Sequence, residues 1–354
     1  MSAEIKQPES LFAATAAQVS IQRAPAHSVK AMVQQAMEAA GWRRFITPGA
    51  DVALKVNLGW DVFLPGAVSA PWVVEGVIQT IRDYVGRIYV VESNQVVVDV
   101  EKALRQTHLD EVCRKYGVEW VNMSLGSFVE INDDSRLVLK HIRIPEILTR
   151  TELITIAVMK THNKTVITGA IKNQWGCLQE LRHNFHLVLS EALVDVNSII
   201  KPRFAVMDAT IGLEENGPKS GKPKEVGLVL ASGDIVAIDT IAAKIMGFDP
   251  SRIPHIQLCS YHNLGVGNLS QIQVMGEQLE DVATPFIPAS HNVVSWLELL
   301  LRRSFIRKLA FNTPLFFLFC WGVRRYYDVW DFLVGRKRRA HILEHSPYGD
   351  QWTS

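Results

Sequence analysis

An uninterrupted apolar run at residues 153–158 (LITIAV) leads directly into a segment, 159–176, that holds three lysines, a histidine and two asparagines. A strand that is apolar on both faces belongs in the middle of a parallel sheet that is covered by helices on both sides. Such sheets collect their ligand-binding groups at the carboxyl ends of the strands. Because an unpaired buried charge is costly, we expect the lysines and the histidine to meet an anion, a carboxylate or a metal.

Helix and strand patterns alternate on both sides of this run. Helical patterns at 28–41, 71–81, 109–116, 182–200 and 234–247 are interleaved with strand patterns at 51–56, 87–91, 118–122, 137–144, 203–207 and 226–230. This order predicts an α/β fold with a mostly parallel, doubly wound sheet and helices on both faces. We expect an N-terminal extension at 1–27, an α/β domain at 28–285, and a basic, aromatic, helical extension with amphipathic character at 286–354.

The charge is unevenly distributed. The chain has 354 residues, 48% hydrophobic and 21% charged, as in ordinary globular proteins. Residues 302–339 contain ten basic and two acidic residues, a net charge of +8, so the total of +1 leaves −7 for the rest. This distribution argues against nucleic-acid binding by the whole chain and predicts that the C-terminal extension meets an anionic surface.

The four cysteines, Cys113, Cys177, Cys259 and Cys320, are far apart in the sequence. They form neither a zinc knuckle nor an iron–sulfur cluster motif, and the sequence identifies no cofactor. We expect a reducing, cytoplasmic setting, since the first residues show no secretory signal pattern.

Polar groups follow several strands, and at these places the chain resembles a known family. The motifs are KVNL at 55–58, KTH at 160–162, TGAIKNQWG at 168–176, Gly217-Pro218 with Gly221, and ASGDIVAID at 231–239. Together they resemble the domain-of-unknown-function family 362 over roughly residues 51–276. Val56 stands where the family usually has proline, and the cysteine-rich ferredoxin-like segment of many relatives is missing. The resemblance implies a cytoplasmic α/β domain with a shared polar site and an association with iron–sulfur proteins, so a reductive reaction needs an external donor such as a ferredoxin.

The lysines predict an anion site. Lys55, Lys160 and Lys172 suit a phosphate or a carboxylate. The amides of Asn57 and Asn173 can donate further hydrogen bonds, and Gly169 and Gly176 allow backbone N–H groups to approach the same anion. The alternative is that some of these lysines lie at the surface and that the glycines only form turns.

The candidates for proton transfer are His162 and Lys160 with Asp239 or Asp208. A metal site would use His162 with His186 or His183 and a carboxylate of Asp208 or Asp234. A histidine satisfied by a backbone carbonyl is the simpler alternative. Asp234 suits a helix start. Asp239 is flanked by apolar residues, so we expect its carboxylate to be buried and paired with a lysine.

The C-terminal extension has two kinds of helical face. Val294, Leu297, Leu301 and Phe305 share one face, and Arg303 and Arg307 share another. The apolar run that follows, 309–323, is too short to span a bilayer comfortably, because spanning takes about 20 residues. With arginines on both sides it favours an interfacial helix hairpin or a re-entrant anchor on an anionic membrane, at the inner face in a cytoplasmic protein. The alternatives are packing against the core of the chain and a homodimer interface.

Two hypotheses follow. The first is an enzyme that acts on a small anionic substrate; the second is a non-catalytic peripheral membrane or cofactor-assembly protein. An enzyme should enclose the lysines with His162 in a deep cleft, whereas a binding protein could leave them on an open face. We predict that six residues converge on one pocket at the carboxyl edge of the sheet: Lys55, Asn57, Lys160, His162, Lys172 and Asn173. We also predict that the glycine-flanked loop 217–221 lies over that pocket.

Overall fold

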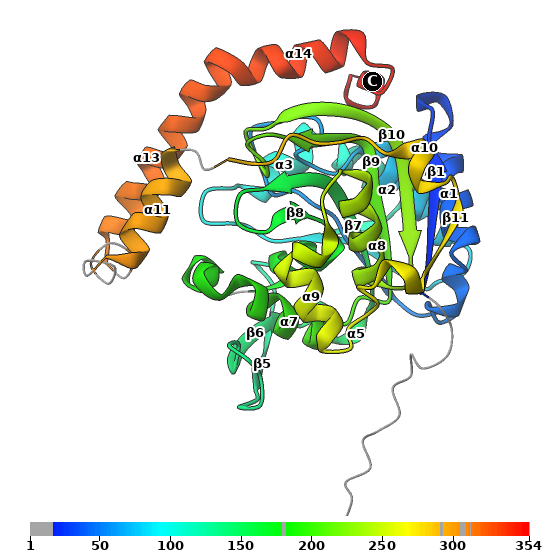
Figure 1. Cartoon of the computed structure of the whole chain (residues 1–354), viewed down its shortest axis with the longest axis horizontal. Coiled ribbons are helices and arrows are strands. Elements are labelled where there is room, and N and C mark those ends of the chain that lie inside the picture. Colours follow the sequence, from blue (N-terminus) through cyan, green and yellow to red (C-terminus); the bar gives the residue numbers. More distant parts are fainter. Residues whose placement is uncertain are drawn as a thin grey trace, which may run out of the picture.

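The computed structural model describes residues 17–178, 182–290, 293–304, 309, 311 and 313–353. Its centre is a nine-stranded sheet with the order β11-β1-β10-β9-β7-β2-β3-β4, and β8 pairs with β7 (Figure 1). The strands are β1 (Ala17–Arg23), β2 (Val52–Lys55), β3 (Ile88–Glu92), β4 (Glu119–Asn122), β7 (Glu152–His162), β8 (Val166–Thr168), β9 (Phe204–Glu214), β10 (Lys222–Ser232) and β11 (Ile272–Gly276).

Most of the sheet is parallel, as predicted. The neighbours β4, β3, β2, β7 and β9 all run in the same direction. Strand β10 is antiparallel to both β9 and β1, because a short turn-rich loop joins β9 to β10 and such a loop can only reverse the chain. Strand β8 likewise returns along the end of β7, pairing Thr168 with Lys160.

Two segments differ from the sequence-based expectation. Residues 17–23, expected in the N-terminal extension, form β1, which lies between β10 and β11 within the sheet. The strand predicted at 137–144 is outside the main sheet: β6 (His141–Pro145) pairs with β5 (Phe128–Asn132) in a separate two-stranded sheet. Buried Ile142 and Ile144 alternate with exposed His141 and Arg143, which is typical of a sheet with one solvated face.

Helices cover both faces of the sheet. In β7, Ile154 and Ile156 belong to the apolar core shared with α1 and α2, whereas Ala157 and Met159 belong to the core shared with α7, α8 and α9. The helices of the domain are α1 (Val29–Ala39), α2 (Pro71–Ile81), α3 (Val100–Gln106), α4 (Leu109–Tyr116), α5 (Ile147–Arg150), α6 (Ala170–Asn173), α7 (Leu189–Ile200), α8 (Ile235–Ile245), α9 (Pro254–Tyr261) and α10 (Leu279–Val282). The long helix predicted at 182–200 consists of a 3-10 helix, Arg182–Val188, followed by α7.

The C-terminal extension is helical, as predicted. It contains α11 (Val293–Arg303) and α13 (Leu315–Trp330), and α13 continues through a π-helical turn, Asp331–Gly335, into α14 (Arg336–His345). Figure 1 shows α11 and α13 at one edge of the molecule and α14 arching back over the domain. At its end, Tyr348 Oη donates a hydrogen bond to the carbonyl oxygen of Ala24 (2.7 Å).

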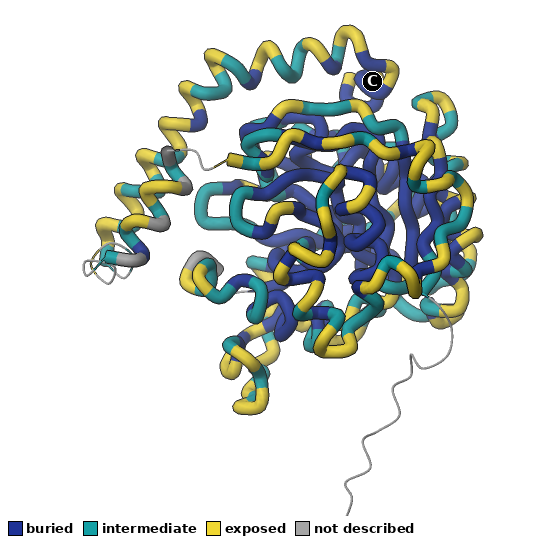
Figure 2. The backbone as a smooth tube through the Cα atoms, in the orientation of Figure 1, coloured by how far each residue is buried: buried dark blue, intermediate teal, exposed yellow. Residues whose placement is uncertain are grey.

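Much of the outer surface of α11, α13 and α14 is exposed (Figure 2). Among the described residues, no helix has the length and apolar character needed to cross a membrane. Phe305 and Arg307, which were assigned to faces of the extension, lie outside the described residues.

Candidate functional site

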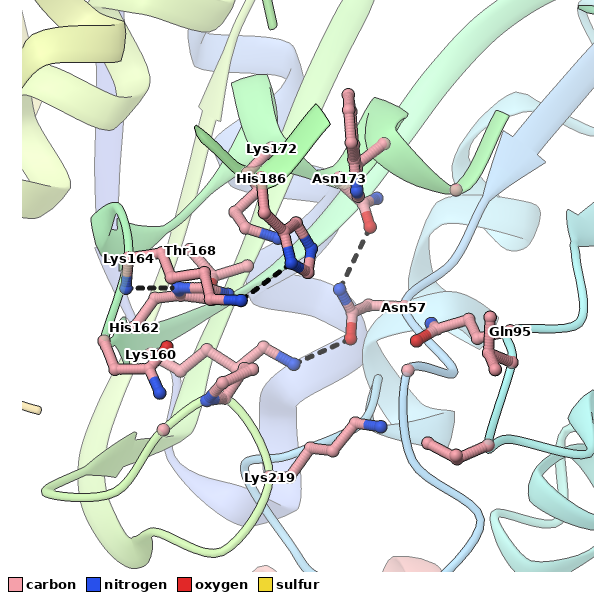
Figure 3. Close-up of a pocket in the computed structure, with 18 of the residues that line it drawn as sticks. Asn57, Gln95, Lys160, His162, Lys164, Thr168, Lys172, Asn173, His186 and Lys219 are labelled. Atoms are coloured by element: carbon pink, nitrogen blue, oxygen red, sulfur yellow. Dashed lines mark hydrogen bonds between the residues drawn. The ribbon is translucent and has the colours of Figure 1, made fainter. Parts of the chain in front are cut away.

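A cavity of about 420 Å³ lies at the carboxyl ends of β2, β3 and β7 (Figure 3). The six residues expected to converge on one pocket all line it, so this prediction is confirmed. They are Lys55, Asn57, Lys160, His162, Lys172 and Asn173. The cavity is also lined by residues of the loop 217–221 and of the helices α11 and α13.

Lys160, near the end of β7, has a buried ammonium group with a side chain that is 2% exposed. Its Nζ donates hydrogen bonds to Asn57 Oδ1 (2.8 Å) and to the carbonyl oxygen of Ala67 (2.7 Å). In the described part of the chain, no carboxylate oxygen lies within 4.0 Å of this nitrogen. The ammonium is therefore hydrogen-bonded but not neutralised by a described residue.

Burial, together with the positive charges of Lys172 and Lys219, lowers the pKa of Lys160 to about 7. Desolvation disfavours the charged form, and neighbouring cations add to that effect. An amine with this pKa is present in both protonation states near neutral pH, which is a requirement for moving protons.

The two asparagines hold Lys160 rather than pointing free donors into the cavity. Asn57 accepts from Lys160 and donates through Nδ2 to Asn173 Oδ1 (3.0 Å). Asn173 Nδ2 in turn donates to the carbonyl oxygen of Lys55 (3.0 Å) and to Thr155 Oγ1 (2.9 Å). This chain of amides fixes the ends of β2 and β7 relative to each other.

Lys55 is already neutralised. Its Nζ donates to Glu92 Oε2 (2.8 Å) and to the carbonyl oxygen of Val56 (2.7 Å), and both charged side chains are buried. A Cβ at Gly176 would lie 2.6 Å from Glu92 Oε1 and 2.7 Å from Lys55 Cε. Gly176 is thus needed because only a residue without a side chain lets the backbone lie this close to the ion pair. This packing role comes in addition to the predicted approach of its backbone N–H to an anion.

His162 presents one ring nitrogen to the backbone. Its Nδ1 accepts hydrogen bonds from the backbone N–H groups of Lys164 (2.9 Å) and Thr165 (3.4 Å), so the proton of the neutral ring is on Nε2. Burial, reinforced by the charges of Lys172 and Lys164, lowers the pKa of His162 well below its ordinary value. The neutral imidazole at the cavity wall can therefore donate a hydrogen bond through Nε2.

A second charged group joins the cavity to α11. Glu298 contacts Lys164 Nζ (2.5 Å) and His186 Nδ1 (2.7 Å). Burial lowers the pKa of His186 to about 4, so the cations that compensate Glu298 near neutral pH are Lys164 and Arg302, whose Nε lies 2.9 Å from Glu298 Oε1. Burial alone would raise the pKa of Glu298, but its contacts with His186 and Lys164 lower it.

His162 and His186 both line the cavity, but the described residues contain no group of three histidine, cysteine or acidic side chains placed to hold a metal. The side chain of His183 lies outside the described part of the structure. His186 contacts Lys164 and Glu298, so this histidine takes part in a polar cluster that ties α11 to the domain.

The predicted acidic partners do not line the cavity. Asp239 accepts from the backbone N–H groups of Ala170 (2.6 Å) and Ile171 (3.0 Å), so its expected lysine partner is replaced by the start of α6. Burial raises its pKa to about 7. Gly169 is needed beside it, because a Cβ there would collide with the Asp239 carboxylate.

Two further aspartates also satisfy backbone donors. Asp208 accepts from Ala70 N and Thr210 N (3.0 Å each), at the start of α2 and within β9. Asp234 caps α8 by accepting from Val236 N (2.8 Å) and Ala237 N (2.9 Å), which confirms its assignment to a helix start. Neither carboxylate lines the cavity.

The loop 217–221 lies at the cavity, as predicted, through Gly217, Pro218 and Lys219. Lys219 Nζ lies 4.8 Å from the centre of the Trp60 ring. The sequence-based site omitted Lys164 and Lys219, although both are in segments that had been singled out. Glu298 had no sequence signal, because it is a single acidic residue within an apolar helical pattern. Tyr327 is one of several aromatic residues in a basic stretch, and nothing in that stretch marks it as part of the site.

One family model matches the chain over more than half of its length. The model of the family described as domain of unknown function (DUF362) matches residues 52–244, which is more than half of the chain. A thylakoid-associated protein from Synechocystis sp. is 27% identical over 225 residues, covering 60% of this chain and 68% of that protein. A crystal structure from Thermotoga maritima is 10% identical with a TM-score of 0.36, covering 67% of this chain and 59% of that one.

Proposed function

The chain belongs to the domain-of-unknown-function family DUF362, and we propose that it is an enzyme that acts on a small phosphate- or carboxylate-bearing substrate in the lysine-lined cavity. The observation that carries this proposal is the state of Lys160. Its ammonium is buried without a carboxylate among the described residues, although a buried charge normally has an opposite charge beside it. A substrate anion would supply that charge.

The roles follow from the geometry. The substrate anion is held near Lys160, with Lys172 and Lys219 at the same cavity. Lys160 exchanges a proton with the substrate through its amine, and the neutral ring of His162 donates a hydrogen bond to the substrate through Nε2. Lys55 and Asn173 keep the strand ends in place. Enclosure of Lys160 and His162 favours an enzyme over an open binding surface.

Phosphate binding tests the proposal. Isothermal titration calorimetry with inorganic phosphate should show binding to the unaltered chain. Lys160→Met should weaken it by at least about tenfold, since a charge-assisted contact is worth roughly 1.5–3 kcal/mol. Lys222→Met, which removes an exposed lysine on β10, is the matched control. Equal affinity of all three proteins, or no binding of phosphate or acetate by any, would contradict the anion site.

A second candidate function, docking on an anionic membrane, is favoured by a different observation. The helices α11 and α13 expose large apolar side chains, including Trp296 (60%), Phe317 (74%) and Trp321 (60%). Arg324 and Lys337 lie along the same extension and form no ion pair with a described residue. Aromatic rings beside basic groups suit a membrane interface. The relative from Synechocystis, whose name places it at thylakoids, supports the same proposal.

Flotation of the full chain with vesicles tests the docking. The protein should float with phosphatidylglycerol-containing vesicles, less at high salt because screening weakens the basic contribution. Phe317→Ser with Trp321→Ser should reduce flotation. Tyr261→Ser removes an aromatic ring that is still more exposed (80%), but lies on α9, and should leave flotation unchanged. If the double variant floats as well as the unaltered chain, α13 is not the docking surface.

A further inference from the structure

We propose that the ligand of the cavity is a phosphate-bearing amphiphile, whose head group lies among the lysines and whose hydrocarbon chain passes along α11 and α13 toward a lipid surface. This inference rests on the proposed anion site and names its substrate class.

The two helices form part of the cavity wall. Helix α11 contributes Val294 and Glu298, and α13 contributes Val323 and Tyr327. Tyr327 is held in place edge-on against Trp60, with ring centres 4.7 Å apart. The cavity that contains the buried lysine ammonium is therefore closed in part by apolar and aromatic side chains of the extension.

The same helices expose apolar side chains on other faces. In α13, Phe317 and Trp321 are exposed, whereas Val323 and Tyr327 line the cavity. At 3.6 residues per turn, these two pairs are on well-separated sides of the helix. A helix with its side chains is about 10–12 Å thick, so one helix separates the outer apolar surface from the cavity. A hydrocarbon chain of moderate length covers that distance.

The charges at the cavity favour phosphate as the head group. Glu92 and Glu298 are compensated by Lys55 and Lys164, so these carboxylates do not cancel the charge at Lys160. Lys172 and Lys219 also line the cavity and act electrostatically on Lys160. A phosphate monoester carries about −1.5 to −2 charges at neutral pH and can meet more than one ammonium, whereas a carboxylate carries only one charge.

An amphiphile accounts both for the cavity-lining side chains of α11 and α13 and for the apolar side chains that these helices expose. A large apolar surface exposed to water marks an interaction site more often than an unused face. A fully water-soluble substrate would require the lysines but not the exposed rings of Trp296, Phe317 and Trp321 on the helices that close its cavity. A membrane amphiphile requires both.

A series of phosphates of increasing chain length tests the inference without a membrane. The probes are inorganic phosphate and ethyl, butyl and hexyl phosphate, kept monomeric in solution and titrated into the full chain by calorimetry. Affinity should rise along the series, by up to about fourfold for each methylene placed on an apolar wall. Val323→Ser should weaken the binding of hexyl phosphate more than that of inorganic phosphate. Phe317→Ser, on the outer face of the same helix, should leave the whole series unchanged.

The outcomes separate the two proposals. Binding of inorganic phosphate with no gain from ethyl to hexyl phosphate would overturn the amphiphile and leave the anion site in place. Absence of binding by every member would overturn the anion site itself. A gain with chain length that survives Val323→Ser undiminished, and also survives Val294→Ser, would place the chain elsewhere and overturn the route along these helices.

Discussion

Replacing Lys160 with methionine should make the stability of the protein less dependent on pH. Methionine has a similar length and no charge, so it keeps most of the packing at the end of β7. The pKa of Lys160 is about 7 in the folded chain and 10.5 ordinarily. Between these two values the unfolded state binds more protons than the folded state, so the folded state of the unaltered protein gains stability as the pH rises.

The magnitude follows from the two pKa values. Each pH step between them is worth about 1.36 kcal/mol, so keeping the lysine in its buried site costs about 4 kcal/mol at pH 7 and about 2 kcal/mol at pH 9. The hydrogen bonds of Lys160 to Asn57 and Ala67 offset part of this free-energy cost, and their contribution varies little with pH. The free energies of unfolding of the variant and the unaltered protein should therefore converge by about 2 kcal/mol from pH 7 to pH 9.

Urea unfolding in phosphate-free buffer at pH 7, 8 and 9 measures this difference. His162 titrates below this range, so it does not contribute. Lys222→Met, on the exposed surface of β10, should show a constant difference from the unaltered protein. If the Lys160→Met difference is equally constant, then Lys160 does not titrate near neutrality, and the reasoning from its buried, uncompensated ammonium is wrong.

Three further outcomes are expected. Gly176→Ala should lower the free energy of unfolding by about 1–3 kcal/mol, because its Cβ would meet a buried ion pair, whereas Gly126→Ala, which has nothing within 4 Å, should be close to neutral in the same urea titration. Glu298→Gln removes the partner of Lys164, so α11 should be cleaved faster by limited proteolysis, and an unchanged cleavage rate would show that this contact does not tether the helix. Asp234→Ala should cost about 1–2 kcal/mol because α8 loses its cap, and an unaltered denaturation midpoint would refute that role.

The parallel part of the sheet could be predicted from the sequence because its strands are apolar on both faces. The run at 153–158 continues as β7, all of whose residues after Glu152 are buried. Strand β1 escaped prediction because its pairing partners, β10 and β11, are distant in sequence and leave no local signal. The strand expected at 137–144 was assigned to the wrong sheet, since periodicity identifies a strand but not its neighbours.

The position of the site was predictable, whereas the partner of each charge was not. Residues at strand ends meet at one edge of a parallel sheet, so Lys55 and Lys160 could be placed together. Which lysine is neutralised depends on Glu92, on another strand, and only three-dimensional packing reveals that contact. The lysine partner expected for Asp239 was wrong for the same reason. Its carboxylate accepts hydrogen bonds from backbone N–H groups, and such groups carry no sequence signature.

The pairing of β1 with β10 and β11 also has a consequence for the order in which the molecule is assembled. Strands β2, β3, β4, β7 and β9 are made from neighbouring stretches of chain and can pair as they are synthesised, whereas β1 must wait for partners made roughly 200 residues later. The contact of Tyr348 with Ala24 comes later still. The lysines are therefore placed before α11 and α13 exist to line the cavity, and a nascent chain that has not reached residue 293 has a cavity without that part of its wall. We expect such a chain to expose the cavity more than the complete protein does, because the wall formed by Val294, Glu298, Val323 and Tyr327 is still missing.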